Sequence, residues 1–517
     1  MFSDHPKHRV PVIAGVLIGL VAGGLGIAVA MLIASLSGSW RSPVLDVGDR
    51  VVDQVPSWAK DLAIDWFGTN DKIALLVGIG LILAGYAAVL GVLLTRGRPK
   101  LAFGGAVVFG LLGAWASLAT RTSSNIFNAV PSVLGAAAVV AAFIAFTRVA
   151  ETESSNEPVS PMHPSHRRRF LASLGVVGAI AATGGLLSRR LDKRFSAAGS
   201  RDTVALAQGD LGPPEIPAGA QATNAAPFYT PNADFYRIDT ALTVPQVPAD
   251  TWMLKITGMV DEPIELSYDD LIARGLVEAD ITLTCVSNLV GGGLVGTARW
   301  QGVRLDELLE SVGIQEGADQ IVGRSVDGYT CGFPVAALDG RDALVAVAMN
   351  GEPLPLEHGF PARLIVPGIY GYASATKWLT EIELTTFDAF DHYWVPRGYA
   401  ALAPIKMQTR IDAPRGLDRI DAGEFAIGGV AWAQPVGISQ VELSIDDGPW
   451  VPAEMAEEVN GSTWRQWSYV WDASPGRHTV TARAIDNNGA IQTADRDEPL
   501  PDGVSGHHSV VVLVNEI

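Results

Sequence analysis

The chain has 517 residues, of which 48% are hydrophobic, and a mean hydropathy of +0.24. These values exclude a single, purely soluble domain and predict that part of the chain lies in a membrane. The formal net charge of −18 disfavours a nucleic-acid partner, because phosphate binding requires clustered Lys and Arg. Two cysteines, Cys285 and Cys331, exclude a disulfide-rich scaffold and a cysteine-bound iron–sulfur cluster.

Four long apolar segments lie in the first 150 residues, at 10–36, 73–94, 101–119 and 129–149. Each is close to or above the ~20 residues that cross a ~30 Å hydrocarbon core. A fifth segment, 170–187, is shorter and rich in Gly and Ala. The sequence therefore predicts an N-terminal all-α transmembrane bundle, with four helices in 1–150 and a fifth in 151–190.

Charges beside these segments predict their orientation. Basic residues precede the first segment and separate the second from the third, whereas the loop 37–70 carries five aspartates. By the positive-inside rule, the N-terminus is cytoplasmic and everything after residue 187 is outside the cytoplasm. Apart from Arg148 at the end of the fourth segment, the apolar segments contain no Asp, Glu, Lys or Arg, which favours an anchor in the lipid bilayer over a transporter or sensor.

The fifth segment opens with His166-Arg167-Arg168-Arg169-Phe170-Leu171. This run resembles a twin-arginine export signal, in which two arginines precede Phe, Leu and a weakly hydrophobic stretch. An ordinary cluster of cytoplasmic positive charge is the alternative. Twin-arginine export carries folded proteins, so it suits a domain that receives a cofactor before it crosses the membrane.

The rest of the chain divides into a linker and two domains. Residues 191–230 are rich in Ala, Gly and Pro and predict a linker. In 231–403, strands at 252–260, 281–285 and 344–349 and helices at 268–275 and 305–313 predict an α+β domain. In 404–517, alternating segments at 425–432, 441–445, 464–471 and 478–485 predict an immunoglobulin-like β-sandwich.

Cys285 ends one of these strands, and three glycines, Gly291 to Gly293, follow it. A thiolate that faces a glycine-lined loop can reach a bulky ligand, because glycine lets backbone N–H groups approach closely. The alternative is that Cys285 is a small buried core residue.

A second group of chemically active residues consists of His358, Arg363 and Lys377, which lie among glycine and proline turns. Arg and Lys held by such turns suit a phosphate, through bidentate and point-charge contacts respectively. Ordinary surface charges are the alternative for each of them.

Five motifs occur in a recognisable order: Thr-Cys-Val-Ser-Asn at 284–288, Ala-Arg-Trp-Gln-Gly-Val at 298–303, Met-Asn-Gly-Glu-Pro-Leu-Pro at 349–355, His-Gly-Phe-Pro-Ala-Arg at 358–363 and Lys-Trp-Leu at 377–379. Together they resemble the sulfite oxidase family of molybdopterin enzymes, which includes the catalytic subunit of bacterial protein-methionine-sulfoxide reductase. The resemblance covers residues 225–515 and leaves out the membrane segments.

The resemblance implies a sulfite-oxidase-type domain with Mo-molybdopterin as its cofactor and Cys285 as the protein ligand of molybdenum. It also assigns a set of residues that hold the pterin and its phosphate: Tyr236, Arg237, Ser325, His358, Arg363 and Lys377. Tyr399, five residues after Trp394, matches the active-site tyrosine. Cys331 matches no family position and is expected in the core. The family often uses the C-terminal domain for dimerisation, which implies a possible homodimer.

The implied activity is oxygen-atom transfer or two-electron chemistry on a small-molecule substrate, with a separate electron-transfer partner or a quinone. Sulfite-oxidising members place one arginine after the cysteine, where this chain has Leu289 and Val290, and another where it has Asp502. The expected loss of two positive charges and gain of one negative charge disfavours sulfite, a dianion. The alternative function is a non-catalytic, membrane-anchored binding module on the same fold.

Overall fold

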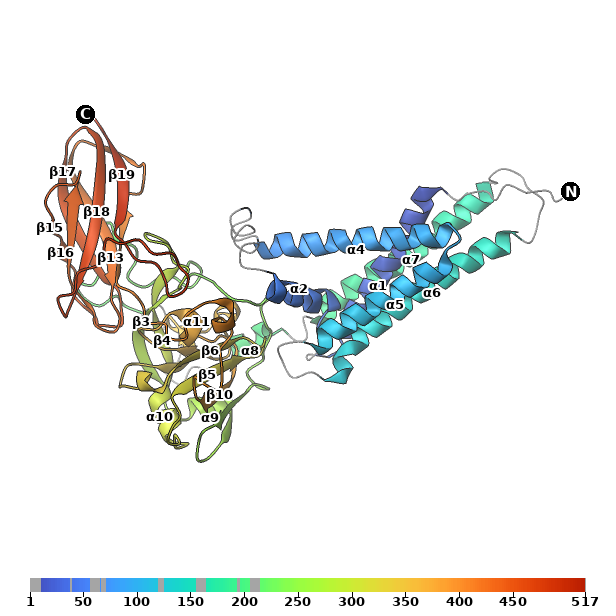
Figure 1. Cartoon of the computed structure of the whole chain (residues 1–517), viewed down its shortest axis with the longest axis horizontal. Helices are drawn as coiled ribbons and strands as arrows, with labels where there is room; N and C mark the ends of the chain where they lie inside the picture. Colours follow the sequence, from blue (N-terminus) through green and yellow to red (C-terminus); the bar gives the residue numbers. More distant parts are fainter. Residues whose placement is uncertain are drawn as a thin grey trace. The chain divides into compact units, whose positions relative to one another are not determined.

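The computed structural model describes residues 11–37, 40–55, 66, 71–119, 125–154, 164–192, 196–204 and 214–516. These residues divide into two units, whose elements Figure 1 labels. The first unit contains residues up to Ser196 together with Ala241–Thr243, and the second contains Ala197–Thr240 and Val244–Ile517.

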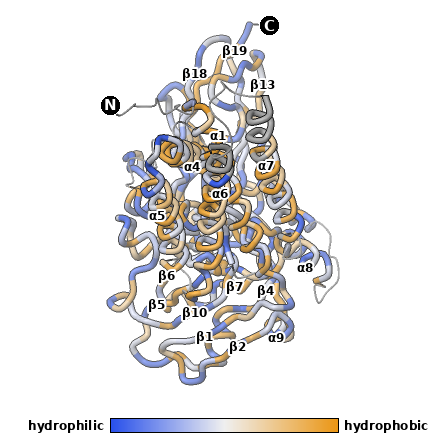
Figure 2. The backbone as a smooth tube through the Cα atoms, turned by 90° about the vertical axis from the view of Figure 1, so that its right-hand side faces the viewer, coloured by the Kyte–Doolittle hydropathy of each residue, from blue (hydrophilic) through white to orange (hydrophobic). Residues whose placement is uncertain are grey.

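The first unit is helical. Its elements are α1 (Val12–Ala34), α2 (Pro43–Gln54), α4 (Asp71–Thr95), α5 (Pro99–Leu118), η2 (Ile126–Ala129), α6 (Val130–Ser154) and α7 (Pro164–Asp192). In the described part of the chain, four helical stretches are long and apolar enough to cross a membrane: Val12–Ala34, Lys72–Thr95, Pro99–Leu118 and Ile126–Arg148. They correspond to the four long segments predicted, and the hydrophobic colouring of α1, α4, α5 and α6 is visible in Figure 2.

The predicted fifth crossing falls in α7, where the apolar stretch Leu174–Ser188 is shorter than the other four. A fifth crossing therefore stays a prediction. Arg167 and Arg168 of the proposed export signal lie in the first turns of α7, and their side chains are outside the described part of the structure.

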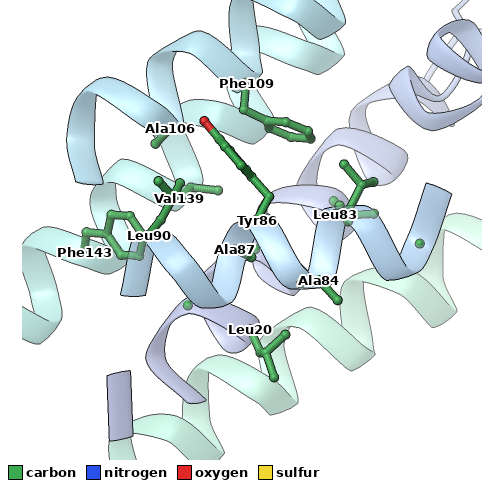
Figure 3. Close-up of a pocket in the computed structure, with 15 residues that line it drawn as sticks. Leu20, Leu83, Ala84, Tyr86, Ala87, Leu90, Ala106, Phe109, Val139 and Phe143 are labelled. Carbon is green, nitrogen blue, oxygen red and sulfur yellow. The ribbon is translucent and has the colours of Figure 1, made fainter. Parts of the chain in front are cut away.

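Small residues bring the membrane helices together. Helix α1 packs against α4, α6 and α7. A Cβ at Gly19 would come within 2.0 Å of the Ala87 carbonyl oxygen, so glycine is required for this approach of α1 to α4. A cavity between α1, α4, α5 and α6 is lined by apolar side chains and by Tyr86, whose hydroxyl donates to the Gly105 carbonyl at 2.9 Å (Figure 3).

The second unit begins with α8 (Ala198–Thr203) and contains two sheets around one core. The first sheet is mixed, in the order β2 (Ile264–Ser267), β1 (Met253–Gly258), β10 (Leu379–Thr385), β5 (Gln320–Ser325), β6 (Thr330–Pro334), with β1 and β10 parallel. The second is antiparallel, in the order β3 (Val277–Thr284), β4 (Val295–Arg304), β7 (Leu344–Met349), β8 (Glu352–Pro353), and β9 (Arg363–Ile365) also pairs with β7.

Short helices connect these strands. They are α9 (Tyr268–Ile272), α10 (Leu305–Glu310), η4 (Val335–Ala337), η5 (Leu356–His358), α11 (Gly371–Ser374) and η6 (Val395–Arg397). Helix α9 begins at a capping box in which Ser267 and Asp270 satisfy each other's backbone N–H groups. Strand β7 is buried at every position, as its uninterrupted apolar sequence predicts.

The C-terminal part of the second unit has two further sheets with a shared core. One sheet has the order β11 (Gln408–Ala413), β13 (Gly423–Trp432), β17 (Arg465–Ala473), β16 (Glu454–Met455). The other has the order β12 (Arg419–Asp421), β19 (His508–Asn515), β18 (Gly476–Asp486), β14 (Ile438–Ile445), β15 (Val451–Pro452). The four predicted strands correspond to β13, β14, β17 and β18, while the immunoglobulin-like assignment stays a prediction.

The linker prediction is wrong over residues 214–230, which pack against the β-rich part of the second unit. Phe228 is 1% exposed, and its carbonyl accepts the Trp464 indole N–H at 3.0 Å. The backbone N–H of Ala222 donates to the side chain of Gln466 at 2.7 Å. An extended segment without hydrophobic period can be fixed in this way by side chains far away in the sequence, so its composition alone does not reveal its packing.

Candidate active site

Cys285 directly follows β3 and lies at the base of a closed loop. Its N–H donates to the Leu294 carbonyl at 2.9 Å, and its own carbonyl accepts from the Asn288 N–H at 3.0 Å. The Asn288 side chain accepts from the Leu294 N–H at 2.7 Å, which closes the glycine-rich loop. The thiol is buried, and burial raises its pKa. Hydrogen bonds from Ser287 act in the opposite direction but are the smaller effect. A soft metal cation would displace the proton of such a thiol.

Three tyrosines, Tyr236, Tyr329 and Tyr370, lie close enough to Cys285 to feel its charge, and Tyr370 is buried. The pKa of each hydroxyl is raised first by burial. The negative charge of a Cys285 thiolate adds to this, after that of Cys331 for Tyr329 and that of Asp502 for Tyr370. Only Tyr236 was predicted from the sequence. Tyr370 lies in the run Gly368-Ile369-Tyr370-Gly371, where flanking glycines were the available signal.

Arg363 supplies an unusual buried cation. It lies in β9 and is 5% exposed, and its Nη1 donates to the His358 carbonyl at 3.0 Å. Its Nε is buried and has no hydrogen-bond partner among the described residues. Burial lowers the pKa of the guanidinium to about 10. A buried donor on a cation without a carboxylate partner fits an anionic group of a bound cofactor.

His358 lies beside Arg363 as a neutral ring. It is 3% exposed, and burial, followed by the positive charge of Arg363, lowers its pKa to about 4. Its Nε2 is 3.1 Å from the Asn232 carbonyl, so Nε2 carries the proton and donates it to that carbonyl. Nδ1 is then left as an acceptor.

Lys377 and Arg237 share one carboxylate. The Lys377 Nζ donates to Asp239 Oδ2 at 2.9 Å, and the Arg237 Nε donates to the same oxygen at 2.8 Å. Lys377 is 9% exposed, and burial lowers the pKa of its ammonium to about 8 although Asp239 acts in the opposite direction. Sequence reasoning missed Asp239, which is two residues after Arg237 and has no motif of its own.

Gly359 explains how these groups come together. It has φ +111, and a Cβ there would be 3.0 Å from the Lys377 Cβ and 3.2 Å from the Arg363 Cβ. The backbone of this turn therefore passes between the two cations, as only glycine allows. Arg363, Lys377 and Arg237, together with the neutral His358 beside Arg363, thus form a continuous group, which we call the cation group.

The other two predicted residues, Ser325 and Tyr399, lie at the edges of this arrangement. Ser325 ends β5, pairs with Leu379 and accepts a hydrogen bond from the Asp327 N–H at 3.4 Å. Tyr399 follows η6, and its ring centroid is 5.4 Å from that of Tyr372 and 5.2 Å from that of Trp394. Tyr372 lies in α11, two residues after Tyr370. Tyr399 therefore packs against the short helix that begins directly after Tyr370. Cys331 is fully buried in the core, as predicted.

The C-terminal sheets also contact the cysteine loop. The Arg410 Nη1 donates to the Gly292 carbonyl at 3.1 Å. Gly291 has φ +77 and lies so close to His508 that a Cβ would be 2.2 Å from Nε2. Neither Arg410 nor His508 was predicted as part of the site, because both are more than 100 residues away in the sequence.

The chain is similar to known proteins in sequence and in structure. A family described as oxidoreductase molybdopterin binding domain matches residues 241–394. The oxidoreductase YuiH of Bacillus subtilis, itself uncharacterised, is 35% identical over 152 residues, which are 29% of this chain and 72% of YuiH.

Human mitochondrial sulfite oxidase is 29% identical over 315 residues, covering 51% of this chain and 57% of that protein. The chain thus spans little more than half the length of this curated relative. Among solved structures, the sulfane dehydrogenase SoxCD from Paracoccus pantotrophus matches with a TM-score of 0.47 and 19% identity, over 55% of this chain and 82% of that one.

Proposed function

Because the chain belongs to the sulfite oxidase family of molybdopterin-dependent oxidoreductases, we propose that it is a membrane-anchored enzyme that acts outside the cytoplasm on a small organic oxide. Its cofactor is Mo-molybdopterin, and the residues present fit this group. The observation that carries the proposal is the cation group, in which Arg363 and Lys377 are buried and the Arg363 Nε lacks a partner among the described residues.

Each residue of the site has a role in this proposal. Cys285 would ligate molybdenum, and Arg363, Lys377, Arg237 and the neutral His358 would hold the pterin and its phosphate. Ser325, which pairs with Leu379 at the end of β5, would also hold the pterin or its phosphate. When bound, the cofactor supplies two-electron oxygen-atom transfer. Tyr399 would orient the substrate oxygen with its hydroxyl.

The proposed direction is reduction. A sulfoxide or N-oxide loses its oxygen atom, takes up two electrons and two protons, and leaves as the sulfide or amine together with water. The electrons come from a separate electron-transfer protein or from a quinol in the membrane. Four apolar helices support the membrane anchor, and the basic residues between α4 and α5 support the orientation. The proposal includes a homodimer formed through the C-terminal sheets.

Steady-state kinetics of the full chain test the proposal. With a reduced artificial donor, methionine sulfoxide and dimethyl sulfoxide should be turned over, and Cys285→Ala should abolish turnover while circular dichroism stays unchanged. With an artificial acceptor, sulfite should be a poor substrate. A sulfite kcat/KM of ~10⁶ M⁻¹s⁻¹, well inside the range of efficient enzymes, would contradict the proposed substrate class.

A further inference from the structure

Lys406 contacts Tyr370 through its backbone N–H, and its side-chain ammonium donates hydrogen bonds to three neighbouring acceptors. Its Nζ donates to the Gly503 carbonyl at 2.7 Å, to Asp502 Oδ1 at 2.9 Å and to Asp497 Oδ2 at 3.5 Å. An ammonium has three N–H donors. All three have acceptors here, so none is left for an oxyanion.

Contacts connect this cluster with the surroundings of Cys285. The backbone N–H of Lys406 donates to the Tyr370 hydroxyl at 3.3 Å. Gly503 has φ +94 and approaches the same hydroxyl so closely that a Cβ would be 2.5 Å from it. Gly371, the residue after Tyr370, lies against the Thr284 carbonyl and the Tyr236 hydroxyl. These atoms are 3.8 and 3.7 Å from the ideal Cβ position of Gly371. Tyr370 and Gly371 therefore connect Lys406 and Gly503 with Thr284, the residue before Cys285.

The charges of the cluster do not balance. Two carboxylates face one ammonium, and the side chains remain partly open to solvent, at 28% exposure for Lys406, 46% for Asp502 and 59% for Asp497. The cluster therefore has a net negative charge at neutral pH. At this cluster, an approaching dianion would meet an ammonium whose three donors are already used, and an unfavourable potential.

We propose that Asp502 and Asp497 are specificity-determining residues, which saturate Lys406 and thereby exclude oxyanions in favour of neutral or cationic substrates. This inference rests on the proposed function, because it names the residues that set its substrate class. It also predicts a latent anion site: with the carboxylates removed, Lys406 becomes a free cation near Tyr370.

Sulfate binding to the full chain in detergent tests this inference without turnover. In Asp497→Ala/Asp502→Ala, the sulfate Kd measured by calorimetry should fall about tenfold relative to the parent, since an ammonium gains two donors and loses two neighbouring negative charges. Adding Lys406→Met should reverse the gain. The control Asp472→Ala removes an exposed carboxylate of β17 and should leave the Kd unchanged.

The milder variant Asp502→Asn keeps the side-chain shape and should give a smaller gain in the same direction if the double variant does not fold. An unchanged sulfate Kd in both variants, or a gain that survives Lys406→Met, would overturn the inference. If the gain appears while no sulfoxide or N-oxide is turned over by the parent, the proposed function fails and the charge assignment stands.

Discussion

Arg363 is a buried arginine whose guanidinium is not neutralised by a carboxylate among the described residues. Its stem and plane lie near Trp300, with the guanidinium carbon 5.2 Å from the ring centroid. Arginine in such a place costs free energy unless a ligand supplies the negative charge. Burial of Arg363 is therefore energetically more favourable in the cofactor-bound protein than in the polypeptide alone.

The first prediction follows from this environment. In Arg363→Met, the molybdenum content of the purified chain should fall to less than about a tenth of the parent value, because the anion loses its buried partner. The melting temperature of the cofactor-free chain should be the same or higher, since a buried unpaired charge has been removed.

Arg304→Met is the matched control, because Arg304 is paired with Asp306 and Asp342. It should retain molybdenum and lose some stability. Normal molybdenum retention in Arg363→Met would remove Arg363 from the cofactor site.

At the residue scale, the motifs predicted Cys285, His358, Arg363 and Lys377, and the family resemblance added Tyr236; the structure places these residues close together. They did not reveal Asp239, Tyr370 or Lys406, which have no distinctive spacing and act through distant partners. The charge argument about sulfite was also incomplete: Asp502 faces Lys406, and Arg410 lies beside the glycine loop. Contacts between residues 100 or more positions apart cannot be derived from local pattern.

The glycine-rich loop after β3 is the element that connects Cys285 with the C-terminal sheets. Gly291 has a left-handed backbone and lies against His508, whereas a Cβ at Gly293 would meet nothing within 4 Å. These two glycines suit a paired test, because they belong to the same loop and only Gly291 combines a positive φ with a close neighbour.

The second prediction is that Gly291→Ala destabilises the chain by ~2–4 kcal/mol, through strain at positive φ and overlap with His508. It should also lower the molybdenum content, because the loop that holds Cys285 is displaced. Gly293→Ala should be close to the parent in both respects. Chemical denaturation followed by tryptophan fluorescence measures the difference, and equal stabilities of the two variants would contradict the loop assignment.

Elements with a strong period were predicted well. The central strand at 344–349 matches β7 at both ends, because an apolar run between turns leaves little freedom. The helix predicted over 305–313 ends earlier, at Glu310, and the strand predicted through Cys285 ends at Thr284. Short edge strands such as β15 and β16 have two residues each and carry no detectable period.

At the scale of the whole molecule, the third prediction concerns export across the membrane. Replacing Arg167 and Arg168 by lysine should leave the second unit on the cytoplasmic side, because the proposed signal requires the arginine pair rather than positive charge alone. Protease accessibility in spheroplasts measures this. Cleavage of the double variant from outside, at the parent level, would favour an ordinary positive-inside cluster.

The fourth prediction concerns acid stability. Burial lowers the pKa of His392 and of His508 to about 4, whereas an unfolded chain binds these protons near pH 6.5. Unfolding therefore takes up protons between these values, and stability falls as the pH falls from about 6.5 towards about 4. The melting temperature of the full chain should drop by roughly 3–5 °C between pH 7.5 and pH 5.0. A constant or rising melting temperature would contradict the neutral state of these rings.

The molybdenum-to-chain ratio of the purified full-length protein tests the central claim most directly, with pterin measured in the same sample. From cells supplied with molybdate, the parent should contain about one molybdenum and one pterin per chain, and Cys285→Ala should lose most of the metal because its protein ligand is gone. A parent chain that is folded, comes from cells that make the cofactor and yet contains neither molybdenum nor pterin would contradict the account.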